Sequence, residues 1–253
     1  MGYGFYDITL YHLSENSDGK DFAVRNNLIS DLYIDFLDGY KPKGTTRISV
    51  DIGSEDHIKG YFGSILCAEV AFNEKEYWLS SSVERNKIVL DTIHRVAILS
   101  AEKYGWDKVV FDRAYRKVVD CDFIYKKELK KKLSKDKKHQ AGLLLEKNGE
   151  STMISVNFYN FKGEFLKSVL LLKSFQSAWF YKNISTHKWF NNLEFGIYTK
   201  NDELIIKASL ANDSSETVIT PVIKTRERLE GYLREITYQE FADESDYIKW
   251  ANQ

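Results

Sequence analysis

The sequence of 253 residues predicts an α+β protein, with a mixed first half that contains a helical pair and a mainly antiparallel second half. Residues 81–120 show helical periodicity behind a capping box. Asn148-Gly149 joins two apolar segments, as expected of a β-hairpin. In residues 204–210 apolar and polar side chains alternate, which is typical of a strand with one buried face. Helical and strand periods in separate parts of one chain indicate the α+β class.

The first elements follow from the spacing of apolar side chains. Residues 5–13 alternate and predict an opening strand. From Asp21 onward apolar side chains recur at intervals of three and four as far as Gly39, which predicts a helix that ends there. Loops with glycine or charged residues then separate three expected strands, at residues 47–52, 64–72 and 76–79.

The helical pair has the clearest local signals. Ser81 and Glu84 have the spacing of a capping box, in which both side chains bond free amides at a helix start. The helix is expected to end at Gly105, because glycine readily adopts the left-handed conformation that closes a helix. A second helix is expected to start at Trp106-Asp107 and to end near Asp120.

A lysine-rich region follows this pair. Residues 123–133 keep a helix-compatible pattern, and residues 126–139 contain eight lysines against two acidic residues. Such a charge run is typical of a solvated helix or a linker. We therefore expect two domains, 1–134 and 140–253, with one continuous α+β domain as the alternative.

The second half is expected to be an antiparallel meander. Residues 143–147 and 152–158 flank Asn148-Gly149, a dipeptide able to form a two-residue type I′ turn. A charged helical segment is expected after Pro221. The further strands are expected at residues 165–173, 193–199 and 204–210.

Composition excludes several classes of function. Lys plus Arg number 36 against 37 Asp plus Glu, so the chain as a whole has no electrostatic attraction to nucleic acid. The longest aliphatic run, Val169 to Leu172, is far shorter than the roughly 20 residues of a membrane-spanning helix. Cys67 and Cys121 are too few for a disulfide framework, which favours a reducing, cytosolic compartment.

Catalytic motifs are weak. His12 and Ser14 have the spacing of one half of a two-histidine phosphoesterase site, but no other histidine is followed by Ser or Thr two residues later. Asp91 and His94 are neighbours at i and i+3 on the expected helix, where a carboxylate could orient an imidazole. The best-placed residues for a hydrolase of nucleotides or phosphoesters are therefore His12, Asp91 and His94. No histidine spacing predicts a metal site, and no motif predicts a cofactor.

A nuclease-like pattern is also present. Asp122 followed by Glu128 and Lys130 matches sites in which carboxylates hold Mg²⁺. Because such sites use a strand and this segment is expected to be helical, we interpret Glu128 as an intrahelical ion-pair partner.

One segment concentrates aromatic side chains between two expected strands. Trp and Tyr give large contact areas with few rotatable bonds, so the segment is a candidate binding surface or a roof over the sheet core. The lysine run lacks interleaved aromatic residues for base stacking, so nucleic acid is a disfavoured partner. The candidate anchors are Phe175, Trp179, Phe180, Tyr181, Trp189 and Phe190.

Residues 85–119, which include Tyr104–Asp107 and Ala114–Tyr115, resemble a helical pair of uncharacterised bacterial proteins, some of polymorphic-toxin immunity type. The resemblance implies a cytosolic bacterial protein that neutralises a toxin by steric occlusion, and it carries over no catalytic residue. We expect a non-catalytic protein-binding protein that needs no cofactor and contacts no membrane. The alternative is the hydrolase described above.

Overall fold

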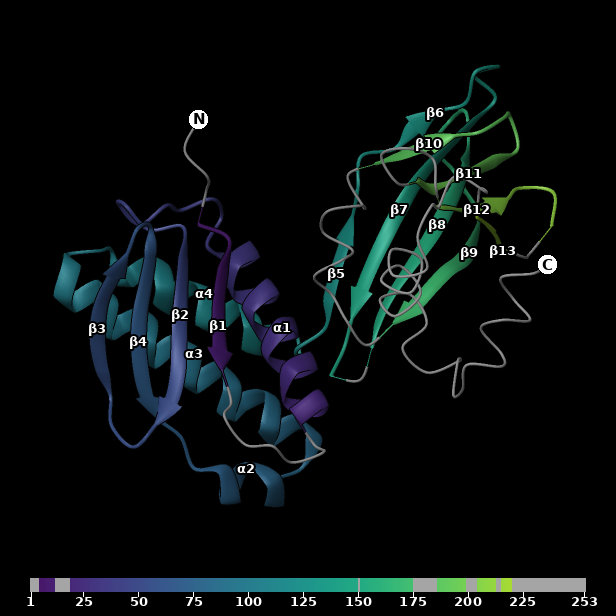
Figure 1. Ribbon diagram of the computed structural model, residues 1–253. Helices are drawn as coiled ribbons and strands as arrows, with labels where there is room; N and C mark the ends of the chain where they lie inside the picture. The colour runs from purple at the N-terminus through teal and green to yellow at the C-terminus, as the bar shows by residue number, and fades with distance from the viewer. Residues whose placement is uncertain are drawn as a thin grey trace. The chain divides into compact units, whose positions relative to one another are not determined.

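The computed structural model has helices and β-sheets, which confirms the α+β class (Figure 1). By its contacts the chain divides into two compact units. The first contains Met1–Tyr125 and Asn148–Glu150, and the second contains Lys126–Lys147 and Ser151–Gln253. The structure describes residues 5–11, 19–149, 151–174, 186–198, 204–212 and 215–219.

The first unit is built on a four-stranded sheet with the order β1-β2-β4-β3. Strands β1, β2 and β4 are parallel to one another, whereas β3 runs antiparallel to β4. The strands expected at 47–52 and 64–72 are confirmed, as is the opening strand. Their bounds are β1 Asp7–Tyr11, β2 Arg47–Gly53, β3 His57–Phe62 and β4 Ile65–Ala71.

Helices cover one face of this sheet. In Figure 1 α3 and α4 lie behind the strands and α1 lies beside β1, while α2 lies at the end of the sheet where β2 and β4 terminate. Alternate strand residues such as Ile48, Val50 and Leu66 are fully buried, because the strand period of two turns them towards the helices. The helices are α1 Gly19–Phe36, α2 Glu74–Leu79, α3 Ser82–Tyr104 and α4 Lys108–Asp120.

The capping signals of the helical pair are confirmed. The Ser81 side chain accepts a hydrogen bond from the Glu84 amide, and the Glu84 side chain accepts one from the Ser81 amide. Gly105 closes α3 at φ 70°, in the left-handed region that glycine tolerates. Asp107 caps α4, which ends at Asp120 as expected.

Residues 76–79, expected to be a strand, belong instead to helix α2. Asn73 caps this helix by accepting a hydrogen bond from the Glu76 amide. Buried Tyr77 packs against Phe22 and Phe72. Three consecutive apolar or aromatic residues after Glu76 are too short a pattern to separate a strand from a single helical turn. Helix α1 also ends earlier than expected, at Phe36.

The second unit begins with a meander of β7 His139–Lys147, β8 Thr152–Asn160 and β9 Phe165–Ser174. Both pairings are antiparallel, so the expected hairpin is confirmed. Lys147 pairs with Thr152, which leaves residues 148–151 as the connection. The prediction of a two-residue type I′ turn is therefore wrong.

The lysine-rich region is not helical. Residues 123–133 contain β5 Tyr125–Glu128 and β6 Lys132–Leu133, and both strands pair with β7. Asp122 and Phe123 have φ values of 51° and 58°, and these two left-handed residues turn the chain after α4. Pairing with a distant strand thus overrides the local helical pattern.

A second sheet completes this unit, with the order β10-β11-β12-β13. The antiparallel pairing of β11 with β12 confirms the strands expected at 193–199 and 204–210. The helix expected after Pro221 lies outside the described residues. In the parts of the chain that the structure describes, no helix is long and apolar enough to cross a bilayer. The strands are β10 His187–Trp189, β11 Glu194–Tyr198, β12 Leu204–Ser209 and β13 Ser215–Ile219.

Candidate functional site

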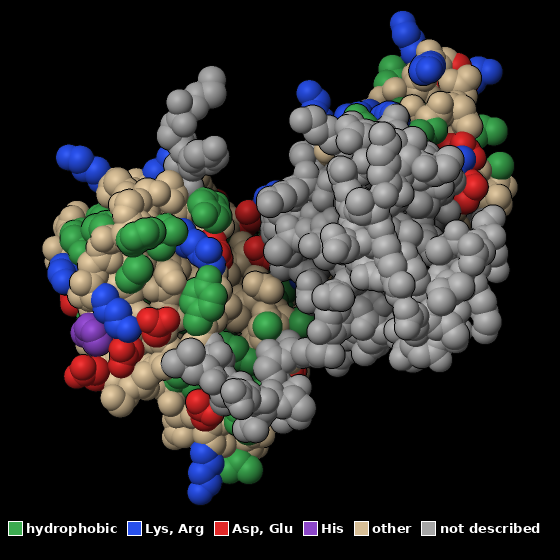
Figure 2. Space-filling model, viewed as in Figure 1, with side chains coloured by type: hydrophobic (Ala, Val, Ile, Leu, Met, Phe, Trp, Pro, Cys, Tyr) green, Lys and Arg blue, Asp and Glu red, His purple; other side chains and the backbone are tan. Residues whose placement is uncertain are grey.

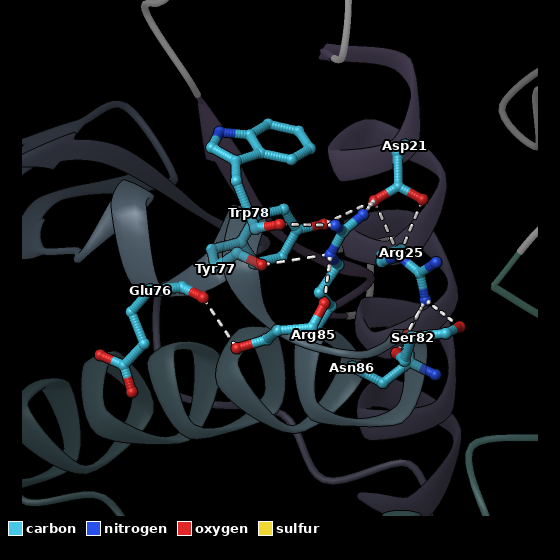
Figure 3. A network of polar contacts seen from close by, with 9 residues as sticks. Asp21, Arg25, Glu76, Tyr77, Trp78, Ser82, Arg85 and Asn86 are labelled. Carbon is cyan, nitrogen blue, oxygen red and sulfur yellow. Dashed lines mark hydrogen bonds and ion pairs between the residues drawn. The ribbon is translucent and has the colours of Figure 1, made fainter.

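Helix α2 is held in place by the guanidinium of Arg85 on α3 (Figure 3). Arg85 Nε donates to the carbonyl oxygens of Tyr77 and Ser80, both at 3.1 Å, and Nη2 donates to that of Trp78 at 2.8 Å. Nη1 lies 3.4 Å from Asp21 Oδ2 on α1. The free carbonyls at the end of α2 are therefore satisfied by a side chain from another helix.

Asp21 and Arg25 extend this network along α1. Arg25 Nε lies 2.9 Å from Asp21 Oδ2, and Nη1 donates to Asn86 Oδ1 at 2.9 Å and to Ser82. The Tyr77 hydroxyl donates to Asp21 Oδ2 at 3.0 Å. Burial raises the pKa of Asp21, but the hydrogen bonds and positive charges around it outweigh burial and hold the pKa below its ordinary value. The network fixes α1, α2 and α3 against one another.

An open surface pocket of about 650 Å³ lies beside this network. It opens where the parallel strands β2 and β4 end, the edge of an α/β sheet at which ligands commonly bind. We call it the α3 pocket, because α3 supplies one wall. It is lined by Gly53 and Ser54 after β2, by Ala71, Phe72, Asn73 and Glu76 after β4, and by Ile88, Asp91, Thr92 and Arg95 of α3.

Arg95 is held at the edge of the α3 pocket by two groups. Its Nε lies 3.2 Å from Asp56 Oδ2, and its Nη2 donates to the Ala71 carbonyl oxygen. The other oxygen of Asp56 accepts a hydrogen bond of 2.8 Å from the Ala71 amide. The guanidinium is thus tied to the end of β4 and to the loop after β2, and its charge is largely neutralised by Asp56.

Two carboxylates face the pocket from different helices. Asp91 accepts from the Tyr115 hydroxyl at 2.7 Å and lies 3.2 Å from Lys87 Nζ. The hydrogen bond to Asp91 raises the pKa of Tyr115 to about 12. Glu76 accepts from Asn73 Nδ2 at 3.1 Å, and within the described residues no cation pairs with its carboxylate. Asp91 is therefore oriented by its neighbours, while Glu76 retains an uncompensated charge.

His94, the expected partner of Asp91, faces α4 instead. Its Nδ1 is 2.8 Å from the Tyr33 hydroxyl, and its Nε2 is 3.3 Å from Asp112 Oδ1. Burial lowers the pKa of His94, partly opposed by Asp112, which favours a neutral ring that donates from Nε2 and accepts at Nδ1. Asp91 and His94 therefore have different hydrogen-bond partners, and Tyr115 links them, because its ring centre lies 4.6 Å from that of His94 and its hydroxyl donates to Asp91.

The structure places the candidate aromatic anchors in different environments. Trp189 is 8% exposed, packs against Phe158 and Phe195, and donates from Nε1 to the Lys132 carbonyl oxygen at 2.9 Å. These contacts place Trp189 in the core of the second unit. Phe190 is half-buried, with Lys188 Nζ 5.2 Å from its ring centre. His12, Phe175, Trp179, Phe180 and Tyr181 lie outside the described residues.

Of the nuclease-like pattern only Glu128 lies on a strand, at the end of β5, whereas Lys130 follows the strand. Glu128 accepts a hydrogen bond from the Tyr159 hydroxyl and lies 3.8 Å from Lys131 Nζ. Asp122 belongs to the turn after α4. Over the described ranges there is no group of three or more His, Cys, Asp or Glu residues able to hold a metal ion. The interpretation of Glu128 as an intrahelical partner is therefore wrong, although it is an ion-pair partner.

The sheet face opposite the helices carries both signs of charge. Arg47 Nε lies 3.0 Å from Asp7, and Lys59 Nζ lies 2.9 Å from Asp51 and 3.0 Å from Glu69. Figure 2 shows acidic and basic side chains together over the lower ends of β3 and β4, with hydrophobic ones above them. Since these charges are paired across strands, the face has little net field of its own.

Sequence reasoning found Asp91, with Arg95 beside it on the same helix, but missed Glu76 and Asp56. The available signal was positional, because polar residues such as Ser54 and Asn73 directly follow two strands. It has meaning only once those strands are known to be parallel and adjacent, since their carboxyl ends then meet at one edge.

No family model, curated protein or solved structure matches this chain. The function therefore has to be argued from the chemistry of the α3 pocket and its surroundings.

Proposed function

We propose that this chain is a cytoplasmic bacterial protein that acts by binding another protein, without catalysis, and that the α3 pocket is part of the contact surface. One observation carries the proposal: the charged groups Asp91 and Arg95 are held by side chains or backbone of neighbouring elements. Groups that are already ordered lose little entropy when a partner binds, so they favour recognition.

The hydrolase alternative has weaker support. A general base needs a nitrogen or oxygen within reach of the proton that it removes. Both ring nitrogens of His94 already have partners, Tyr33 and Asp112, and the ring does not line the α3 pocket. Among the described pocket residues Asp91 and Arg95 are held by Tyr115 and Asp56, which supports binding over acid–base chemistry.

Neutralisation of a toxin by steric occlusion is the specific form that we propose for this binding. The resemblance to immunity proteins covers residues 85–119, and this segment includes the α3 residues that line the pocket. A partner seated on these residues would cover the ends of β2 and β4. Occlusion requires contact area and no chemical step.

The test is a direct titration of the intact protein against a partner purified from the host and identified. Arg95→Ala should weaken binding about tenfold or more, because a held guanidinium at an interface is a common hot spot. Arg113→Ala is the matched control, since Arg113 is exposed on α4 and does not line the pocket. Both variants must first show the wild-type circular dichroism spectrum.

Two results would reject the proposal. Unchanged affinity of a folded variant carrying both Arg95→Ala and Asp91→Asn would exclude the α3 pocket from the contact surface. Turnover of a nucleotide or phosphoester that disappears in His94→Ala would instead assign the chain to the hydrolase class.

A further inference from the structure

We infer that the α3 pocket receives an arginine side chain of the partner protein, with the guanidinium between Glu76 and Asp91. The inference rests on the proposed function for the identity of the partner. The preference of the pocket for a guanidinium is a property of this chain alone and is testable without any partner.

The shape and apolar lining suit a long side chain with a polar end. Ala71, Phe72 and Ile88 supply an apolar wall, which can cover the methylene stem of an arginine. The Phe72 ring is fixed from behind by Phe22 and Tyr77, whose ring centres lie 5.5 and 5.6 Å away. An open pocket of about 650 Å³ has room for one such side chain.

The charge of the pocket selects a cation. Glu76, Asp91 and the nearby Asp56 carry three negative charges, against two positive charges on Arg95 and Lys87. Among these five described groups one negative charge is in excess, and Glu76 has the neutral Asn73 amide as its side-chain partner. An incoming cation balances this charge, whereas an anion would meet the two lining carboxylates.

The arrangement favours arginine over lysine. Glu76 comes from α2 and Asp91 from α3, so the carboxylates approach from two elements. A guanidinium has five donors in a planar fork and can bond two carboxylates at once, while an ammonium acts as a point charge. Its flat face can also stack on an aromatic ring such as Phe72. Arg85 keeps α2, and with it Glu76, in position for this contact.

The test uses N-acetyl-arginine amide as the probe and N-acetyl-citrulline amide, its neutral isostere, as the control ligand. Amide resonances of the intact protein are followed by NMR during each titration. The arginine compound should shift the pocket amides of Ser54, Asn73 and Thr92 saturably, with a dissociation constant in the millimolar range. The citrulline compound should leave these resonances unchanged.

Variants locate the interaction. Glu76→Gln and Asp91→Asn should each lower the affinity for the arginine compound about fivefold, because each removes a charged acceptor. Glu102→Gln is the matched control: Glu102 is also on α3, pairs with Lys108, and does not line the pocket. It should bind the probe as the wild type does.

Three outcomes would overturn the inference: equal binding of the citrulline compound, saturable shifts only outside the pocket, or an equal loss in Glu102→Gln. Its failure is distinguishable from failure of the proposed function. If the probe does not bind but Arg95→Ala still weakens binding of the partner, only the arginine inference is rejected. If the probe binds and the pocket variants leave the partner's affinity unchanged, the proposed contact surface falls.

Discussion

Lys147 allows the sharpest test of the second unit, because its side chain is buried. The residue is 2% exposed and ends β7, on the same strand face as the buried Leu143 and Leu145. Burial lowers the pKa of Lys147 from 10.5 to about 7, since a charged amine loses hydration in the interior. The change Lys147→Met replaces the amine by an apolar side chain of similar length.

The sign and the magnitude follow from proton linkage. The pKa is lower in the folded chain, so between pH 7 and 10.5 the unfolded chain binds more protons and stability rises with pH. A difference of about 3.5 between the two pKa values corresponds to a penalty of about 5 kcal/mol when the amine is fully charged. The remaining penalty is about 4 kcal/mol at pH 7 and about 2 kcal/mol at pH 9.

Urea unfolding at pH 7 and pH 9, followed by circular dichroism and tryptophan fluorescence, measures this difference. The stability of Lys147→Met relative to the wild type should fall by about 2 kcal/mol from pH 7 to pH 9, because the penalty for the buried amine in the wild type shrinks over this range. Lys147→Arg is the control, because it keeps its charge throughout and should be less stable than the wild type at both. A difference in stability between Lys147→Met and the wild type that does not change with pH would refute the reasoning.

Three further predictions concern capping, the core and the α1 network. Ser81→Ala should lower the free energy of unfolding by about 1 kcal/mol, because it removes half of the capping box with Glu84; an unchanged denaturation midpoint would contradict this. Trp189→Ala should lower the free energy of unfolding by about 3–5 kcal/mol, because it truncates a core side chain, and Phe190→Ala should lower it clearly less. Equal losses in the two variants would show that Trp189 is not a core residue. Asp21→Asn should lower the free energy of unfolding, measured in urea at pH 7, by about 1–3 kcal/mol. Because the pKa of Asp21 is lowered in the folded chain, this contribution is present above pH 3.8 and should fade in more acidic solution; a loss independent of pH would count against the network.

The elements that were predicted correctly are those whose signals are local. Helix α3 could be placed from Ser81, Glu84 and Gly105, since a capping box and a left-handed glycine act within one turn of the helix end. The β7–β8 hairpin could be placed because its strands are close in sequence. The connection of this hairpin could not be predicted, because the register that pairs Lys147 with Thr152 depends on the whole sheet.

The errors arise where distant residues decide the outcome. Residues 76–79 form a helix whose end carbonyls are bound by Arg85 from α3, a contact that no local pattern contains. Residues 123–133 extend because they pair with β7, although their own pattern is helix-compatible. Intrinsic propensity is a weak prior in both places, and the tertiary partner decides.

In the α3 pocket, too, local features could be predicted from the sequence and long-range contacts could not. Asp91 could be singled out from its place on the expected helix, but its orientation by Tyr115 depends on how α4 packs against α3. Asp56 and Arg95 are far apart in sequence and meet only because β2 and β4 end at one edge of the sheet. A pocket assembled from strand ends therefore stays invisible until the strand order is known.

Amide hydrogen exchange of the intact protein, with and without its purified partner, tests the central claim most directly. Burial of the α3 pocket should slow exchange at residues 53–54, 71–76 and 88–95, while the exposed surface of α4 around Arg113 exchanges as before. Unchanged exchange in all three pocket segments, with protection confined to other parts of the chain, would contradict the account.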